Sequence, residues 1–336
     1  MILKMNLEKN SYDIEISKGI LKDIHKDFEC RNHILVVTDS GVPTKYLESF
    51  IQNINDKCFI YTIEQGEQSK NIDNLKNILQ FMLSNNFKRN DCVIALGGGV
   101  VGDLAAFSAS IYMRGIDFYN IPTTLLSMVD SSIGGKTGID FGGVKNSVGT
   151  FYQPKKVYID LDVLDTLDKR LINCGLAESI KMALCLNKEY YYYLKDNITN
   201  LDYEKVVVEN CKMKKDVVEK DEKESNLRKV LNFGHTIGHG IEEASNGKLL
   251  HGECVALGML CMSDDSIKNE LIEIYEKIGL PTKVTINKEK VLSLIKHDKK
   301  SIGDEIDCVV VNKAGTFEFE KKTIEEIADR FDIIST

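Results

Sequence analysis

The chain has 336 residues, of which 43% are hydrophobic and 28% charged, which is ordinary for a folded globular protein. This length allows two domains with separate cores. The net charge of −8 argues against a nucleic-acid or anionic-membrane partner, and no apolar run is long enough to cross a membrane.

The cysteines and the N-terminal residues indicate the compartment. Nine cysteines are scattered along the chain without a Cys-x-x-Cys pair. Their odd number and irregular spacing argue against a disulfide framework, and reduced thiols suit a reducing compartment. Residues 1–6 lack the apolar core of a signal peptide. We therefore expect a cytoplasmic protein.

The first half of the chain alternates strand patterns with helical ones. Strands are predicted at 2–7 and 12–17, which form a hairpin, and at 33–37, 58–63, 91–96, 116–121 and 157–160. Helical spacing occupies 71–85 and 100–112. Such alternation predicts a mostly parallel sheet in a Rossmann-like nucleotide-binding domain. Residues 122–146 are predicted to be a long polar connection with little regular structure, and such loops are usually functional.

The second half is helical. Helices are predicted at 173–187, 202–222, 234–246, 251–268 and 288–297, with one late strand at 306–311. The change of pattern places the domain boundary within residues 161–172. We therefore expect an α/β domain at 1–165 and an all-α domain at 166–336.

A glycine-rich segment, residues 96–103 (LGGGVVGD), follows one predicted strand and opens a helix. Glycines let the backbone approach a pyrophosphate, and the helix N-terminus attracts its charge. A tight turn would need only one glycine, so four favour dinucleotide binding, although the pattern is not GxGxxG.

Two other polar segments are weaker signals. Residues 65–70 follow a strand where a nucleotide could bind, although alone they resemble an ordinary polar loop. Lys136, Lys145 and Asn146 could bind a phosphate, and the alternative for each lysine is a solvated surface charge.

Three histidines lie within seventeen residues and among glycines. His235 and His239 are four residues apart, on one face if the segment is helical, and His251 follows. Such a group can bind Zn²⁺ with a carboxylate or thiolate, although single histidines are more often core or capping residues. Thr236 occupies the position where a zinc protease has glutamate, so the pattern does not indicate peptide hydrolysis.

Further charged residues accompany the histidines. Glu178 could be the carboxylate that the histidines need, or it could form an ordinary ion pair with Lys181. Lys214, Arg228 and Asn232 flank the histidine segment. Basic residues at these positions of an acidic protein indicate an anionic substrate.

Five segments in this order resemble the 3-dehydroquinate synthase family: GGGVVGD, PTTLLSMVDSSIGGKTG, GLAESIK, LNFGHTIGH and HGE. The resemblance extends from about residue 30 to residue 312. It implies an N-terminal NAD-binding α/β domain, a C-terminal α-helical metal-binding domain and a homodimer. Members of this family belong with the sugar-phosphate cyclases.

The resemblance also implies a reaction. Family members convert 3-deoxy-D-arabino-heptulosonate 7-phosphate into 3-dehydroquinate and phosphate, in the second step of the shikimate pathway. A hydroxyl is oxidised by NAD⁺, phosphate is eliminated, the ketone is reduced again, and an intramolecular aldol reaction closes the ring. NAD is recycled, and a bound Zn²⁺ or Co²⁺ polarises the substrate hydroxyl.

Matching by motif assigns the site residues. The implied metal ligands are Glu178, His235 and His251, so the resemblance moves His239 from the metal to the substrate. The implied substrate contacts are Arg114, Asp130, Lys136, Asn146, Lys181, Lys214, Arg228, Asn232, His239 and Lys300. Among these, Lys136, Lys181, Lys214 and His239 are implied to be catalytic. The implied NAD contacts are Asp39, Glu67, Lys70, Gly98, Gly99, Val100, Val101, Gly102, Asp103, Thr123, Thr124, Lys136, Lys145, Val163, Leu164, Asp165 and Thr166.

The chain departs from the family pattern at Asp140, Leu171 and Gly240, where the family usually has Asn, Glu and Ala. None of these removes an implied ligand. The nearest alternative function is another cyclase, such as an inosose or valiolone synthase, whose substrates lack the carboxylate that Arg228 and Lys214 would bind. A glycerol-dehydrogenase-like oxidoreductase and a non-catalytic regulator fit the phosphate-type and basic residues less well.

Overall fold

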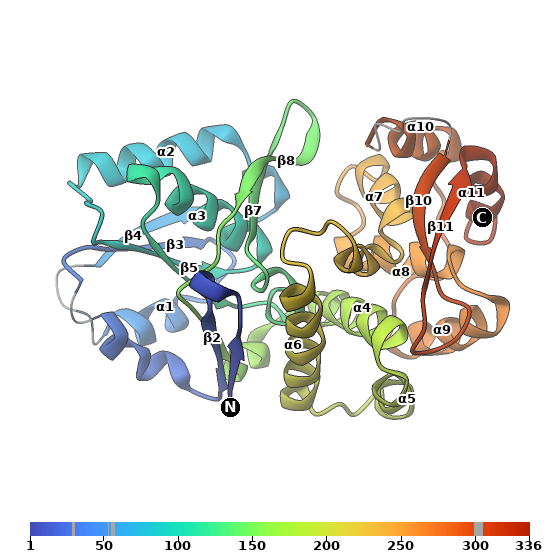
Figure 1. The fold of residues 1–336 in the computed structure, drawn as a ribbon, viewed down its shortest axis with the longest axis horizontal. Coiled ribbons are helices and arrows are strands. Elements are labelled where there is room, and N and C mark those ends of the chain that lie inside the picture. Colours follow the sequence, from blue (N-terminus) through green and yellow to red (C-terminus); the bar gives the residue numbers. More distant parts are fainter. Residues whose placement is uncertain (29–30, 53, 55–57, 299–304) are drawn as a thin grey trace. The chain divides into compact units, whose positions relative to one another are not determined.

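The computed structural model describes residues 1–28, 31–52, 54, 58–298 and 305–336. The chain divides into two compact units, Met1–Asp168 and Lys169–Thr336 (Figure 1). This division lies within the segment 161–172 named above. None of the helices in the described ranges combines the length and the apolarity that crossing a bilayer requires.

The first unit is built on a seven-stranded sheet with the order β1-β2-β9-β6-β5-β3-β4. The strands are β1 (Ile2–Met5), β2 (Tyr12–Ser17), β3 (Ile34–Asp39), β4 (Cys58–Ile63), β5 (Cys92–Gly97), β6 (Asp117–Pro122) and β9 (Lys156–Asp160). All neighbouring pairs are parallel except the β1–β2 hairpin. The Rossmann-like sheet and each of its predicted strands are confirmed.

Helices cover both faces of this sheet. Figure 1 shows α2 (Ile72–Ser84) and α3 (Gly99–Ile111) above it and α1 (Thr44–Ile51) below it. Strand β5 is buried at every position, because a central parallel strand packs on both faces. The apolar stripe of α2 and nearly all of α3 pack against β3 and β5 in one core.

The prediction that residues 122–146 lack regular structure was wrong. The segment contains a π-helical turn (Ser127–Ser131), strand β7 (Lys136–Phe141) and the start of β8 (Val144–Phe151), which pairs with β7 in an antiparallel hairpin. Gly142 and Gly143 form its turn with φ of 62° and 80°, a conformation that favours glycine. These glycines were interpreted as loop residues, whereas they are required by the hairpin.

The second unit is helical, as predicted. Its helices are α4 (Lys169–Leu186), α5 (Lys188–Asn197), α6 (Tyr203–Lys220), α7 (His235–Ala244), α8 (His251–Cys261), α9 (Asp265–Ile278), α10 (Lys288–Asp298) and α11 (Ile324–Phe331). Two details differ. The predicted helix 251–268 is two helices, because Asp264 caps a new helix by accepting from the backbone N–H of Ser266. The late strand β10 (Glu305–Val310) pairs with β11 (Glu318–Thr323), which sequence periodicity did not reveal.

Candidate active site

Apart from Lys136 and Lys145, which lie on the β7–β8 hairpin, the predicted NAD-binding residues of the first unit follow the carboxyl ends of parallel strands. Asp39 ends β3, residues 65–70 follow β4, residues 98–103 follow β5, Thr123 and Thr124 follow β6, and residues 163–166 follow β9. Ligands of open α/β sheets bind at this edge. The segments are therefore grouped as a nucleotide site requires.

The N-terminal turn of α3 is shaped for close approach. A Cβ on Gly98 would lie 3.2 Å from Thr124 Cγ2, and one on Gly99 would lie 3.1 Å from Ser131 Oγ. The first turn of α3 contains no acidic side chain, so its free N–H groups and the helix dipole favour an anion. This turn can accept a pyrophosphate.

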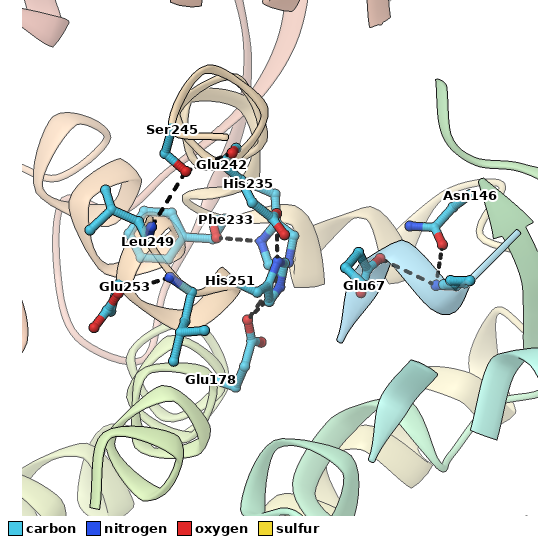
Figure 2. Close-up of polar contacts among 12 residues, drawn as sticks. Glu67, Asn146, Glu178, Phe233, His235, Glu242, Ser245, Leu249, His251 and Glu253 are labelled. Carbon is cyan, nitrogen blue, oxygen red and sulfur yellow. Dashed lines mark hydrogen bonds and ion pairs between the residues drawn. The ribbon is translucent and has the colours of Figure 1, made fainter. Parts of the chain in front are cut away.

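Lys70 joins three of these segments. Its Nζ donates to Asp103 Oδ2 at 2.6 Å and to Asn146 Oδ1 at 2.5 Å. It also lies 4.0 Å from Glu67 Oε1, and Figure 2 shows the contacts with Asn146 and Glu67. Burial disfavours the charged ammonium, but Asp103 and Glu67 outweigh this effect and raise the pKa of Lys70. The cation therefore ties residues 65–70 and the start of α3 to the β7–β8 hairpin.

The predicted phosphate-binding residues of this unit are more exposed. Arg114 has a φ of 68° in a turn after α3, and Met113 before it has a φ of 49°. Such strain in non-glycine residues is often found at functional sites. Lys136 is exposed at the start of β7, and Asp130 is half-buried in the π-helical turn.

In the second unit, three helices bring the implied metal ligands together. Glu178 of α4 is fully buried, and His235 and His251 begin α7 and α8. Nε2 of His251 lies 3.4 Å from Glu178 Oε1, and Nε2 of His235 lies 3.7 Å from the same oxygen (Figure 2). All three ligand atoms lie within 4.8 Å of one another, which is the spacing that one metal ion needs.

Glycines permit this approach. Gly234 has a φ of 77°, and a Cβ there would lie 2.7 Å from the backbone oxygen of Val255 in α8. A Cβ on Gly252 would lie 2.4 Å from the backbone oxygen of Cys174 in α4. Helix α8 therefore packs backbone to backbone against its neighbours, which brings His251 to Glu178.

The hydrogen bonds of the rings orient Nε2 towards Glu178. The carbonyl of Phe233 can only accept, so Nδ1 of His235 donates to it at 3.1 Å. Nδ1 of His251 donates to Glu242 Oε2 at 3.0 Å. Among the described residues, no hydrogen bond reaches the buried Glu178 Oε1. Two Nε2 atoms facing an oxyanion need a cation or a proton between them, so these residues fit a divalent metal.

The protonation states agree with this fit. Burial opposes ionisation of Glu178, but Lys181 and His251 outweigh it and hold the pKa of the carboxyl at about 2. Burial, with Lys181 and His239 nearby, lowers the pKa of His235 well below its usual value. Burial also disfavours the charged form of His251, yet Glu178 and Glu242 raise its pKa to about 10. Without a metal ion, a proton on His251 therefore balances the carboxylates.

The implied catalytic cations of this unit are buried beside the cluster. Lys181 forms an ion pair with Glu178 and is 1% exposed, Arg228 is 1% exposed and Lys214 is 5% exposed. Helix α4 packs against α6, which carries Lys214, and against the turn 227–232, which carries Arg228. Buried cations are normally paired with anions, as Lys181 is with Glu178.

The segment that carries Arg228 is organised by Asp221. Its carboxylate accepts from the backbone N–H groups of Ser225, Asn226 and Arg228 at 2.7–3.0 Å. Burial opposes ionisation, but these donors lower the pKa of Asp221. Nη1 of Arg228 donates to the backbone oxygen of Glu222 at 2.5 Å. The guanidinium is therefore held in place by its own loop.

The sequence interpretation missed two side chains that shape the cluster, Glu242 and Glu253. Glu242 lies on the same face of α7 as His235 and His239, at spacings of seven and three residues, which could have revealed it. Glu253 accepts from the backbone N–H of Leu250 at 2.8 Å and from Nε and Nη2 of Arg170 at 2.6 and 2.7 Å, and these bonds fix the start of α8. Asn232 donates to Glu224 at 3.1 Å, and Lys300 lies outside the described residues.

Comparison with known proteins identifies the family. Residues 60–174 match the family 3-dehydroquinate synthase N-terminal, and residues 175–301 match 3-dehydroquinate synthase C-terminal. The chain is 40% identical to the 3-dehydroquinate synthase of Acetivibrio thermocellus over 332 residues, covering 93% of this chain and 92% of that one.

Two solved structures share the fold. A 2-deoxy-scyllo-inosose synthase complexed with carbaglucose-6-phosphate, NAD⁺ and Co²⁺ matches with a TM-score of 0.90 at 20% identity, over 98% of this chain and 99% of that one. The 2-epi-5-epi-valiolone synthase of Streptomyces hygroscopicus, with NAD⁺ and Zn²⁺ bound, matches with a TM-score of 0.88 at 24% identity, over 98% of each chain. The family matches and the 40% identity over most of the chain show that it belongs to the 3-dehydroquinate synthase family.

Proposed function

We propose that the protein converts 3-deoxy-D-arabino-heptulosonate 7-phosphate into 3-dehydroquinate and phosphate, with NAD and Zn²⁺ or Co²⁺ as cofactors. The observation that carries this proposal is in the second unit. The ligand atoms of Glu178, His235 and His251 are close enough to bind one metal ion. The elements packed there carry three buried cations, Lys181, Lys214 and Arg228. A substrate with a hydroxyl to polarise and a carboxylate to bind needs this combination.

The residues have distinct roles in this proposal. Glu178, His235 and His251 hold the metal, which supplies Lewis acidity towards a substrate hydroxyl. NAD⁺ supplies a hydride acceptor that is regenerated in each turnover. Arg228 binds the carboxylate through its planar fork, which lysine does not offer. Lys181 and His239 contact the reacting part of the substrate, where they stabilise charge and move protons.

The first unit binds the other groups. The N-terminal turn of α3 at Gly98 and Gly99 binds the pyrophosphate of NAD. Arg114, Lys136 and Asn146 bind the phosphate that is eliminated. Exposed cations suit this role, because phosphate has to enter and leave at each turnover.

One assay tests the proposal. The protein is incubated with the heptulosonate phosphate, NAD⁺ and Zn²⁺ while released phosphate and NADH absorbance are followed. We expect phosphate to accumulate over many turnovers while NADH stays at or below the enzyme concentration. Release only from a hexose phosphate would identify another sugar-phosphate cyclase, and stoichiometric NADH would identify a net oxidoreductase.

We also propose a homodimer in the cytoplasm. The β7–β8 hairpin exposes Phe141, Val144, Val148 and Phe151, which are 37–53% exposed. Exposed apolar side chains along one hairpin are typical of an interaction surface, and a second copy of the chain is the proposed partner. Sedimentation analysis should give a dimer that Phe151→Glu weakens. The eight described cysteines are free thiols, which suits a reducing compartment.

A further inference from the structure

Among the described residues of the second unit, two groups of side chains have the spacing of a metal site, and they share one member. The first is Glu178, His235 and His251, and the second is His239, Glu242 and His251. His251 cannot serve both groups as a neutral ligand, because a neutral imidazole has only one lone pair. The role of Glu242 therefore decides which group can bind a metal.

The hydrogen bonds favour the first group. Nδ1 of His251 lies 3.0 Å from Glu242 Oε2, whereas Nε2 lies 3.4 Å from Glu178 Oε1. An ionised carboxylate only accepts, so the proton of the neutral ring lies on Nδ1 and the lone pair on Nε2. Glu242 is half-buried, on the turn of α7 that follows His239, and Figure 2 shows it beside His251.

From this geometry we infer that Glu242 is a positioning residue for the metal site, and that the second group does not bind a metal of its own. Its carboxylate sets the tautomer and the orientation of His251, so that Nε2 points to Glu178. Metal-bound histidines usually donate their other N–H to such an acceptor, and removing the acceptor weakens metal binding about 10–100-fold. This inference rests on the metal site of the proposed function and adds the residue that orients it.

The experiment compares Glu242→Ala, Glu242→Gln and the control Glu243→Ala. Glu243 is the next residue of α7 and is exposed. Its replacement removes a glutamate side chain from the same helix and leaves the hydrogen bond between Glu242 and His251 in place. Zinc affinity is measured by competition with a chromophoric chelator, and bound zinc per subunit is measured after dialysis. Thermal unfolding of each zinc-free variant shows whether it is folded.

We expect one zinc ion per wild-type subunit and an affinity about 10–100-fold lower for Glu242→Ala. The zinc affinity of Glu242→Gln should fall less, because the amide oxygen of the glutamine can still accept a hydrogen bond from Nδ1 of His251. The visible spectrum of bound Co²⁺ should change in Glu242→Ala and stay unchanged in Glu243→Ala. A general loss of packing would instead lower the unfolding temperature of the zinc-free protein. It would not make the zinc affinity of Glu242→Ala lower than that of Glu242→Gln.

Two results would overturn the inference. One is wild-type zinc affinity in a folded Glu242→Ala variant. The other is two zinc ions per wild-type subunit with one lost in Glu242→Ala, which would make Glu242 a ligand. Neither measurement uses the heptulosonate phosphate. Failure of the proposed reaction is therefore distinguishable from failure of the role assigned to Glu242.

Discussion

The two clusters of predicted site residues are built differently. In the first unit they lie on turns after β3, β4, β5, β6 and β9, and the implied phosphate contacts Arg114 and Lys136 are exposed. In the second unit they project from packed helices, and Lys181 and Arg228 are each 1% exposed. A site on packed helices is formed before its ligand arrives, whereas exposed cations on turns are ordered by the ligand. Substitutions in the helical cluster should therefore have the larger effects.

The largest effect should come from the metal ligands. His251→Ala should lose zinc affinity and lower kcat/KM by at least roughly 10³-fold, because a metal Lewis acid contributes several kcal/mol. His239→Ala should keep its zinc, and its kcat/KM should fall by roughly 10²–10⁴-fold, which is the contribution typical of a proton-transfer residue. Bound metal per subunit and kcat/KM are measured for both. A metal-free His239→Ala beside a zinc-loaded His251→Ala would refute the ligand set.

Arg228 tests whether a buried cation of the helical cluster binds the substrate carboxylate. Arg228→Lys should weaken transition-state binding by roughly 2–5 kcal/mol, which is roughly 30- to 5,000-fold in kcat/KM. The neighbouring Lys229, which is half-buried and pairs with Asp307, is exchanged for Arg as the matched control, and this variant should retain its activity. Near-normal kcat/KM for Arg228→Lys would remove this assignment.

Lys70 tests the turns of the first unit. Lys70→Met removes the cation between Asp103 and Asn146, so both side chains lose a hydrogen-bond donor. The loss should lower the free energy of unfolding by roughly 1–3 kcal/mol. We expect NAD⁺ affinity, measured by calorimetry, to fall about tenfold. Lys76→Met on the exposed face of α2 is the control. Unchanged NAD⁺ affinity would show that these segments bind independently.

Gly252 tests the packing that forms the helical cluster. A Cβ there would meet Cys174 backbone atoms at 2.4–2.5 Å, so Gly252→Ala should destabilise the fold by roughly 1–3 kcal/mol and weaken zinc binding as α8 shifts. Gly240→Ala, whose Cβ would meet mainly side chains of α10, should keep its zinc affinity. Denaturant unfolding and chelator competition measure both. If Gly240→Ala lost zinc affinity and Gly252→Ala kept it, the close packing of α8 against α4 would not explain how the zinc site is formed.

The smallest effect should be at Asp140, where the family usually has Asn. Its Oδ1 accepts from the backbone N–H of Asn146 at 2.8 Å, and an amide oxygen can accept this bond equally. Asp140→Asn should therefore change stability and NAD⁺ affinity by less than about 0.5 kcal/mol. Asp140→Ala removes the acceptor and should lower NAD⁺ affinity more than Asp140→Asn does. A larger loss in Asp140→Asn would show that the negative charge of Asp140, and not its hydrogen bond, supports NAD⁺ binding.

Much of this protein was readable from its residues alone. Apolar runs separated by helical spacing predicted the parallel sheet, because parallel strands are buried on both faces. The glycine run predicted the turn before α3, and long motifs predicted the family. The match of Glu178, His235 and His251 to family ligands identified a set that the structure brings together.

Only the tertiary structure decided how these residues are oriented. Spacing alone allowed His235 and His239 to bind one metal together, whereas in the structure Nε2 of His235 and of His251 faces Glu178. Glu242 lies on the helix face of His235 and His239, but only the packing of the helices brings it to His251. Asp221 and Glu253 accept from backbone N–H groups of their own loop and helix start, contacts that the sequence interpretation did not recognise. The glycines near the histidines were noted in the sequence, but their reason is the backbone contact of α8 with α4 and α7, which exists only once the helices have packed.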